Sequence, residues 1–383
     1  MASVREIVAR EFPERAVATV APSARGNRKR TTFVTFEDGG GVVVQQAANR
    51  AALRTEAQLA SRLQAETVLP IPAVLADGIR EADAYVVVER APGEDLHERF
   101  ASLDTTHQQS LASTFGRYLA TLHELTAFDA FGQVTWTDGR FVARGTVDWR
   151  AWFDDYLHAG LDALTADFDD VRAQVRKFAT MATLPERPES RLYPWDVRPG
   201  NALVSDGRLT AILDWGDPLA ADPGVAVAKA EHLVCDWYVA DGGHLREAFR
   251  SGYERVRAYP TVRPVYRVAA VVHSAVDSNG IVTRPGFPER TGARRWRSTA
   301  SDYAPRWRTD PSVPVAPSRT GPLWEGIAIE EGVGVSVWDG CLQTVRQDTL
   351  ERQYFPRPQR ATARPPTVAS EKRQTTTANV YQF

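Results

Sequence analysis

The sequence predicts an α+β fold in three parts: a small N-terminal lobe built on an antiparallel sheet, a mostly helical C-terminal lobe, and a poorly structured C-terminal tail. Three observations predict it. Short β-prone runs are concentrated in the first 90 residues. Apolar residues recur at helical spacing between about residues 108 and 276. Beyond about residue 286 this period is lost, and Arg, Pro, Ser and Thr predominate. The expected divisions are residues 1–91, 92–290 and 291–383.

The composition is that of an ordinary globular protein. The chain has 383 residues, of which 43% are hydrophobic and 25% charged, so two lobes with a sizeable core are expected. A net charge of -2 provides no basic field to attract nucleic acid. There is no membrane-length apolar run, no apolar signal-peptide region, and only two isolated cysteines. We therefore expect a cytoplasmic protein without nucleic-acid or membrane partners; its oligomeric state is left open.

The N-terminal lobe is expected to combine β-prone runs with two helices. The second helix has an apolar side formed by Leu53, Ala57, Leu59 and Leu63. In chain order, the expected elements are a helix at 3–12, strands at 16–20, 31–36 and 42–46, a helix at 50–63 and a strand at 84–88.

The C-terminal lobe is expected to be helical. In its first helix Leu111, Phe115, Tyr118 and Leu122 recur at spacings of four, three and four. Another helix begins with Asp222-Pro223, an N-cap followed by a first-turn proline. The expected helices are 108–125, 147–164, 169–182, 222–238, 243–257 and 262–276.

The stretch 192–222 carries the most specific pattern. Its Asp-Gly pair at 206–207 lies between two apolar runs, which is the strongest short-range signal for a β-hairpin. Counting outward from a two-residue turn sets Asn201 opposite Ile212. Asp214 then lies on the same face, at a diagonal separation of roughly 7 to 8 Å. An amide and a carboxylate placed in this way can share one metal ion.

Asp196 reaches the same end of the hairpin from the preceding loop, so Asp196, Asn201 and Asp214 are expected to converge. Phosphoryl transfer from ATP needs such a set: one Asp accepts the proton of the attacking hydroxyl, while an Asn and a second Asp hold magnesium against the phosphates. Arg198 is a further candidate, either to neutralise phosphate charge or to form a salt bridge within the loop.

With this segment the chain resembles the aminoglycoside phosphotransferase and choline kinase-like family, which has a protein kinase-like fold. Its members carry D-x-x-P-x-N, a hairpin, and an Asp in I-D-W/F; this chain has DVRPGN at 196–201 and ILDW at 212–215. The resemblance covers about residues 15–285 and implies ATP and Mg²⁺ as cofactors. Only eight positions separate Asp214 from Asp222, too few for a segment that holds a polypeptide substrate, so a small hydroxyl-bearing acceptor is expected.

The resemblance also implies a loop that covers the nucleotide phosphates and a hinge that binds adenine. The covering loop has one glycine and many cations. Its candidate phosphate contacts are Arg25, Asn27, Arg28, Lys29 and Arg30. The hinge candidates, which would act through backbone groups, are Glu89, Arg90 and Ala91.

Two positions depart from the family pattern. The third strand has Gln45 or Gln46 where a lysine normally binds phosphate, and an amide brings no charge. Glu56, at the position of the glutamate that pairs this lysine, then needs another partner: a metal-bound water, an arginine of the covering loop, or solvent. Pro194 replaces the His of His-x-Asp, although its fixed φ can hold the loop.

The lost lysine leaves an alternative to the active enzyme. A missing phosphate contact removes transition-state stabilisation, so a catalytically impaired protein that binds nucleotide or another ligand is the second hypothesis. A third hypothesis is an interaction protein that uses the Arg-rich tail.

Overall fold

The computed structural model describes residues 3–23, 29–80, 83–239 and 241–277. All of them belong to one of the two units into which the chain divides. The candidate phosphate contacts Arg25, Asn27 and Arg28 and the expected tail at 291–383 lie outside the described residues.

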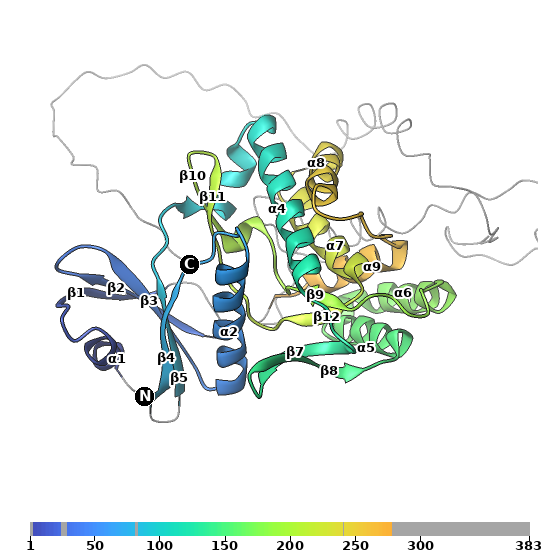
Figure 1. Ribbon diagram of the computed structural model, residues 1–383. Coiled ribbons are helices and arrows are strands. Elements are labelled where there is room, and N and C mark those ends of the chain that lie inside the picture. Colours follow the sequence, from blue (N-terminus) through green and yellow to red (C-terminus); the bar gives the residue numbers. More distant parts are fainter. Residues whose placement is uncertain (1–2, 24–28, 81–82, 240, 278–383) are drawn as a thin grey trace, which may run out of the picture. The chain divides into compact units, whose positions relative to one another are not determined.

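A five-stranded antiparallel sheet forms the N-terminal part (Figure 1). The strands are β1 (Val17–Pro22), β2 (Arg30–Phe36), β3 (Gly41–Ala47), β4 (Val74–Arg80) and β5 (Asp83–Glu89), in the order β1-β2-β3-β5-β4. β4, at the sheet edge, was not predicted from the sequence, because it contains Asp77 and Gly78, residues depleted in strands. It forms because pairing with β5 supplies its hydrogen bonds.

Each face of this sheet is covered by a helix. α1 (Val4–Glu11) places Ile7 and Val8 against the inward residues of β2, β3 and β5. α2 (Arg50–Glu66) covers the opposite face through Leu53 and Ala57. Both helices start at a side-chain cap, Ser3 for α1 and Asn49 for α2, whose oxygens accept a first-turn N–H at 3.2 and 3.1 Å.

The C-terminal part is mostly helical, which confirms the predicted fold class (Figure 1). Its helices are α3 (Leu96–Arg99), α4 (Thr105–Leu125), α5 (Trp149–Asp162), α6 (Asp169–Met181), α7 (Pro223–Glu231), α8 (Gly243–Glu254) and α9 (Pro264–Ser274). The helix expected at 222–238 ends earlier than predicted, because α7 passes into a π-helical turn at His232–Asp236. Among the described helices, none has the length and apolar character to cross a membrane.

Two glycines bring α4 and α8 into backbone contact. A Cβ atom at Gly116 would lie 2.0 Å from the Phe249 carbonyl oxygen, and one at Gly252 would lie 1.8 Å from that of Ser113. Real Cβ atoms do not approach this closely. The lack of a side chain at both positions therefore sets the separation of the two helices.

Two smaller sheets belong to the C-terminal part, with orders β11-β10-β6 and β8-β7-β12-β9. Their strands are β6 (Glu94–Asp95), β7 (Phe131–Thr137), β8 (Arg140–Thr146), β9 (Arg191–Tyr193), β10 (Ala202–Ser205), β11 (Arg208–Ile212) and β12 (Leu219–Ala221). The β7–β8 hairpin was not predicted, although its Asp138-Gly139 turn, with φ of 50° and 77°, carries the same signal as 206–207.

The β7–β8 hairpin also holds α2. α2 lies between the five-stranded sheet and β7 (Figure 1). The buried Thr55 hydroxyl accepts the N–H of Trp136 at 3.0 Å and donates to the carbonyl of Ala51 at 2.9 Å. One side chain thus joins the helix of the N-terminal part to a strand of the C-terminal part.

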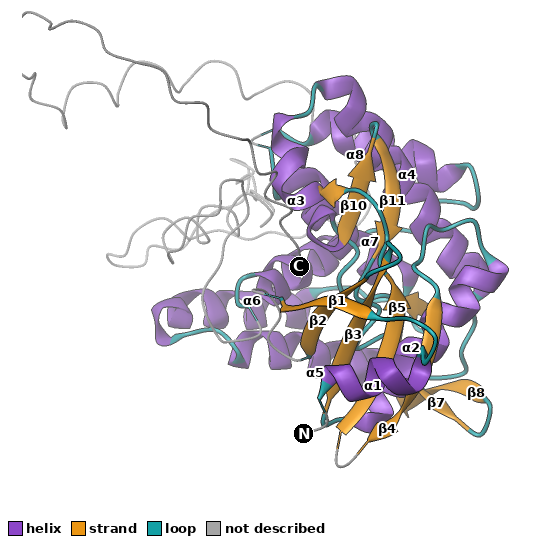
Figure 2. Cartoon of the chain, turned by 90° about the vertical axis from the view of Figure 1, so that its left-hand side faces the viewer, coloured by secondary structure: helices purple, strands orange, loops and turns teal. Residues whose placement is uncertain are grey.

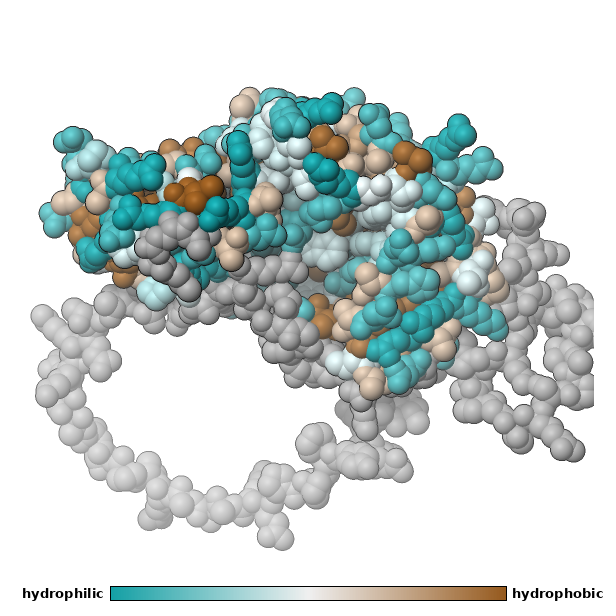
Figure 3. Space-filling view, turned by 90° about the horizontal axis from the view of Figure 1, so that it is seen from below, coloured by the Kyte–Doolittle hydropathy of each residue, from teal (hydrophilic) through white to brown (hydrophobic). Residues whose placement is uncertain are grey.

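The described surface mixes hydrophilic and hydrophobic residues, and on the face shown in Figure 3 the hydrophobic ones form small groups. Large apolar side chains with more than half of their surface exposed include Val68, Ile79 and Val147, which lie on separate elements or loops. Scattered exposure of this kind is normal for a globular protein and does not by itself mark an interface.

Candidate active site

The predicted hairpin is present as β10 and β11 (Figure 2). Asp206 and Gly207 have φ of 50° and 71°, the left-handed conformation that a type I′ turn requires at both central positions. Ser205 faces Arg208, as expected. The Asp206-Gly207 pair was therefore sufficient to predict the position of the turn.

The register changes further from the turn. A bulge at Thr210 moves Ile212 opposite Ala202, so the prediction that Asn201 faces Ile212 is wrong by one residue. The N–H of Leu213 instead donates to the carbonyl of Asn201 at 2.8 Å. Thr210 has no partner in the β10–β11 pairing, and its hydroxyl instead donates to the carbonyl of Pro92 at 2.6 Å.

The backbone conformation of Asp214, and not the alternation of a strand, sets the direction of its side chain. It has φ of 59°, so the chain leaves the strand direction at this residue. Its side chain is 51% exposed. Gly216 lies two residues further along the chain. A Cβ atom on Gly216 would lie 3.4 Å from Asp214 Oδ1 and 3.3 Å from Glu56 Oε2. The carboxylates of Asp214 and of Glu56 on α2 are therefore close to each other.

Two side chains of the preceding loop hold Asp196. The Asn201 Nδ2 donates to the Asp196 carbonyl at 2.9 Å and to its Oδ2 at 3.2 Å. The Arg198 Nε forms an ion pair with the same carboxylate oxygen at 3.0 Å. Of the two interpretations of Arg198, the loop salt bridge is the one present; a contact with phosphate stays a prediction. The Asp196 carboxylate is thus oriented from two sides while 24% of the side chain remains exposed.

A cation–π contact supports this loop in the region of the replaced histidine. Trp195, between Pro194 and Asp196, has the Lys229 Nζ 3.3 Å from its ring centroid. Lys229 lies on α7 with 3% of its surface exposed, and His273 of α9 meets the Trp195 ring edge-on at 5.4 Å. Packing against α7 and α9 therefore fixes the residue next to Asp196 without a histidine.

An ion-pair cluster joins the covering loop, α2 and the hairpin. The Lys29 Nζ lies 2.5 Å from Glu56 Oε1 and 2.9 Å from Asp214 Oδ1. The exposed fractions of the Lys29 and Glu56 side chains are 17% and 12%. Glu56 is therefore not a surface acid, and its partner is a lysine rather than an arginine. In the sequence alone, Lys29 was only one of several candidate cations of the covering loop.

Burial and charge act in opposite directions on this cluster. Burial lowers the pKa of Lys29, but the carboxylates of Glu56 and Asp214 raise this pKa by more, so it lies above its ordinary value. Burial raises the pKa of Glu56, and Lys29 opposes this shift. The ammonium is consequently charged at any physiological pH.

The hinge candidates differ in their backbone hydrogen bonds. The N–H of Glu89 donates to the Ala73 carbonyl at 2.8 Å, and that of Arg90 to the Gly41 carbonyl at 3.4 Å. Both donors are used within the N-terminal part. Adenine binding through a backbone N–H therefore stays a prediction for Ala91.

His123 and Asp222 have structural roles. The His123 Nδ1 lies 2.7 Å from the Tyr253 hydroxyl, and burial, with Arg257 and Arg191 nearby, lowers the pKa of His123 to about 3. Asp222 caps α7 as predicted: its Oδ1 accepts the Gly224 N–H at 2.7 Å. Neither residue belongs to the group around Asp196 and Asp214.

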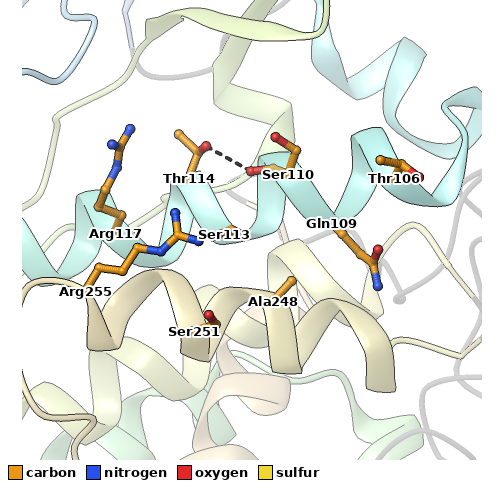
Figure 4. Close-up of a pocket in the computed structure, with 9 residues that line it drawn as sticks. All are labelled: Thr106, Gln109, Ser110, Ser113, Thr114, Arg117, Ala248, Ser251 and Arg255. Atoms are coloured by element: carbon orange, nitrogen blue, oxygen red, sulfur yellow. Dashed lines mark hydrogen bonds between the residues drawn. The ribbon is translucent and has the colours of Figure 1, made fainter.

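One pocket lies apart from these residues, between α4 and α8 (Figure 4). Its volume is about 460 Å³, and its lining includes Ser110, Ser113, Arg117 and Arg255. None of the predicted site residues lines it. The candidate active site is therefore defined by its side-chain contacts and not by this cavity.

The fold is that of kinase-like phosphotransferases. Its sheet part holds a Lys–Glu pair, and its helical part holds a loop Asp, an Asn and a hairpin Asp, which are residue types that phosphoryl transfer uses. The chain belongs to the phosphotransferase enzyme family (APH), whose family model matches residues 19–265, more than half of its length. This confirms the resemblance inferred from the sequence. No curated protein matches the chain.

Solved structures share the fold. A thermostable mutant of aminoglycoside phosphotransferase APH(4)-Ia, in ternary complex with AMP-PNP and hygromycin B, is 18% identical, with a TM-score of 0.51 over 72% of this chain and 90% of that chain. A putative fructosamine-3-kinase from Thermobifida fusca YX-ER1 is 19% identical, with a TM-score of 0.50 over 79% of this chain and 98% of that chain. One from Haemophilus somnus 129PT is 13% identical, with a TM-score of 0.50 over 71% and 89%.

Proposed function

We propose that the protein transfers the γ-phosphate of ATP to a hydroxyl group of a small molecule in a magnesium-dependent reaction. The observation that carries this proposal is the orientation of the Asp196 carboxylate by Asn201, in the same chain segment that brings Asp214 to Lys29 and Glu56. A carboxylate oriented in this way accepts the proton of an attacking hydroxyl. Family membership and the nucleotide complexes of structural relatives support the proposal.

The available donors suit magnesium. Within the described ranges no group of three or more His, Cys, Asp or Glu side chains is placed to hold a metal ion. Magnesium in phosphotransferases takes only one or two protein ligands, with phosphates and water completing its shell. The Asn201 Nδ2 donates to Asp196, so the Asn201 amide oxygen and the Asp214 carboxylate are the proposed metal ligands. The bound ion would neutralise charge that develops on the phosphates.

The remaining part of the mechanism is positioning. Asn201 and Arg198 restrict the Asp196 side chain, so a bound hydroxyl meets a carboxylate that is already oriented. The division of the chain into lobes at residues 91 and 290 is part of this proposal, with nucleotide bound by the first lobe and acceptor by the second.

The second candidate, a nucleotide binder without efficient turnover, is favoured by one observation. Arg198 pairs with the same Asp196 oxygen that Asn201 contacts, so the base is engaged before any substrate binds. For turnover, the acceptor hydroxyl must reach the other carboxylate oxygen or displace Arg198.

An acceptor panel distinguishes the two candidates. The protein is mixed with ATP and Mg²⁺ and with aminoglycosides, choline, amino sugars or homoserine, and ADP release is measured by a coupled assay. We expect turnover with one class, and a loss of at least about 100-fold in kcat for Asp196→Asn. Asp206→Asn, in the turn of the same hairpin, is the matched control, because Asn also tolerates the positive φ found there.

Each outcome of the panel has a separate meaning. Nucleotide binding without turnover on any acceptor supports the binder. Equal turnover in Asp196→Asn and the wild type excludes Asp196 as the base. Absence of nucleotide binding contradicts both candidates.

A further inference from the structure

The sheet register shows which face each residue near α2 occupies. Thr31 pairs with Gln45, and Arg30 pairs with Gln46. Paired residues in an antiparallel ladder point to the same face, and successive residues alternate. Ala47 packs with the α2 residues, so Gln45, two positions earlier, faces α2 as well. Gln46 points to the opposite face and is 4% exposed.

Lys29 directly precedes β2, and its contact with Glu56 shows that its side chain extends over the α2 face. It lies two residues before Thr31, which shares the face of Gln45. Gln45 therefore approaches α2 from β3 and Lys29 from the residue before β2, and the Lys29 ammonium lies 2.5 Å from Glu56. The cation that Glu56 requires comes from the residue that precedes β2, the strand next to β3.

From this geometry we infer that Lys29 is the residue that binds the nucleotide phosphates, in place of a lysine on β3 at position 45. The inference rests on the proposed function. An ammonium has three N–H donors, and the contacts with Glu56 and Asp214 use two of them. The third donor is available to a phosphate oxygen, while Asp214 links the lysine to the predicted metal ligands.

This arrangement also accounts for the buried Glu56. A carboxylate that is 12% exposed and near Asp214 is costly without a cation, because burial and like charge both oppose ionisation. Lys29 supplies that cation, as the strand lysine does in protein kinases. Gln45 therefore need not carry a charge for the site to hold an anionic ligand.

The test compares two ligands that differ only in their phosphate groups. Dissociation constants for AMP-PNP with Mg²⁺ and for adenosine are measured by calorimetry on the full chain. We expect Lys29→Ala to weaken AMP-PNP binding about 10- to 100-fold, the effect of losing a charge-assisted hydrogen bond, and to change adenosine binding less than about twofold. The double variant Lys29→Ala/Gln45→Lys, which returns the lysine to β3, should recover AMP-PNP affinity to within about threefold of the wild type.

A matched control separates the site from general charge effects. Arg80→Ala removes a cation from the same sheet that also pairs with a carboxylate, Glu6 at 3.1 Å. It should leave both dissociation constants unchanged.

The possible failures are distinct. If the wild type binds AMP-PNP and Lys29→Ala binds it equally well, or if adenosine and AMP-PNP weaken in parallel, Lys29 does not bind phosphate. If Gln45→Lys gives no recovery, Lys29 does not replace the strand position. If the wild type does not bind AMP-PNP, the proposed function itself fails.

Discussion

The attachment of α2 through Thr55 leads to a quantitative prediction. Thr55→Val keeps the shape of the side chain but removes the acceptor of the Trp136 N–H, which lies 3.0 Å from the hydroxyl. Valine cannot accept a hydrogen bond, and Thr55 is 3% exposed, so water does not readily replace the lost partner.

The expected cost follows from the two hydrogen bonds of the hydroxyl. The bond donated to the Ala51 carbonyl contributes little, because Ala51 lies inside α2, where helix geometry already gives its carbonyl a backbone N–H. The main loss is a buried N–H without a partner, which costs about 1–3 kcal/mol. We therefore expect the free energy of unfolding to fall by about 1–3 kcal/mol.

Urea unfolding followed by circular dichroism measures this change. Thr121→Val is the control, because the Thr121 hydroxyl on α4 only donates to the carbonyl four residues earlier and stays partly exposed. The control should lie within about 0.5 kcal/mol of the wild type. Equal unfolding free energies for the two variants, at equal denaturant slopes, would refute the reasoning.

Two further predictions concern packing and pH. Gly116→Ala should reduce the free energy of unfolding by at least about 2 kcal/mol, because the new Cβ would lie 2.0 Å from the Phe249 carbonyl oxygen and α8 must move. Stability should also fall on acidification below about pH 6.5. Burial lowers the pKa of His123 and of His273 to about 3. The unfolded chain therefore binds protons that the folded chain excludes, at about 1 kcal/mol per histidine between pH 6 and pH 5.

These two predictions have their own controls. Gly243→Ala, at the start of α8, brings its Cβ only to 3.4 Å from Asp241 Oδ1, so it should be neutral or stabilising. A similar loss in both glycine variants would contradict the packing argument. His123→Gln should halve the pH dependence that the two histidines contribute between pH 6 and pH 5. An unchanged dependence would show that His123 is not kept neutral by the fold.

The sequence by itself determined the local structure and the kind of chemistry. Helical periodicity placed α4, the Asp206-Gly207 pair placed a turn, and Asp222-Pro223 placed the start of α7. These features depend on residues that are close in the chain, so their signals can be read without the fold. The D-x4-N segment at 196–201 and Asp214 indicated phosphoryl transfer for the same reason.

Only the tertiary structure decided how these residues meet. The bulge at Thr210 depends on the Pro92 carbonyl, which is more than 100 positions away in the chain. Likewise, Lys29 binds Asp214 across 185 positions. Turn rules describe residues that are close in the chain and contain no information on such contacts. The register predicted for Asn201 was therefore wrong, and the lysine partner of Glu56 was not predicted. Long-range packing brings the positive charge of Lys29 to Glu56, although β3 itself contains no lysine.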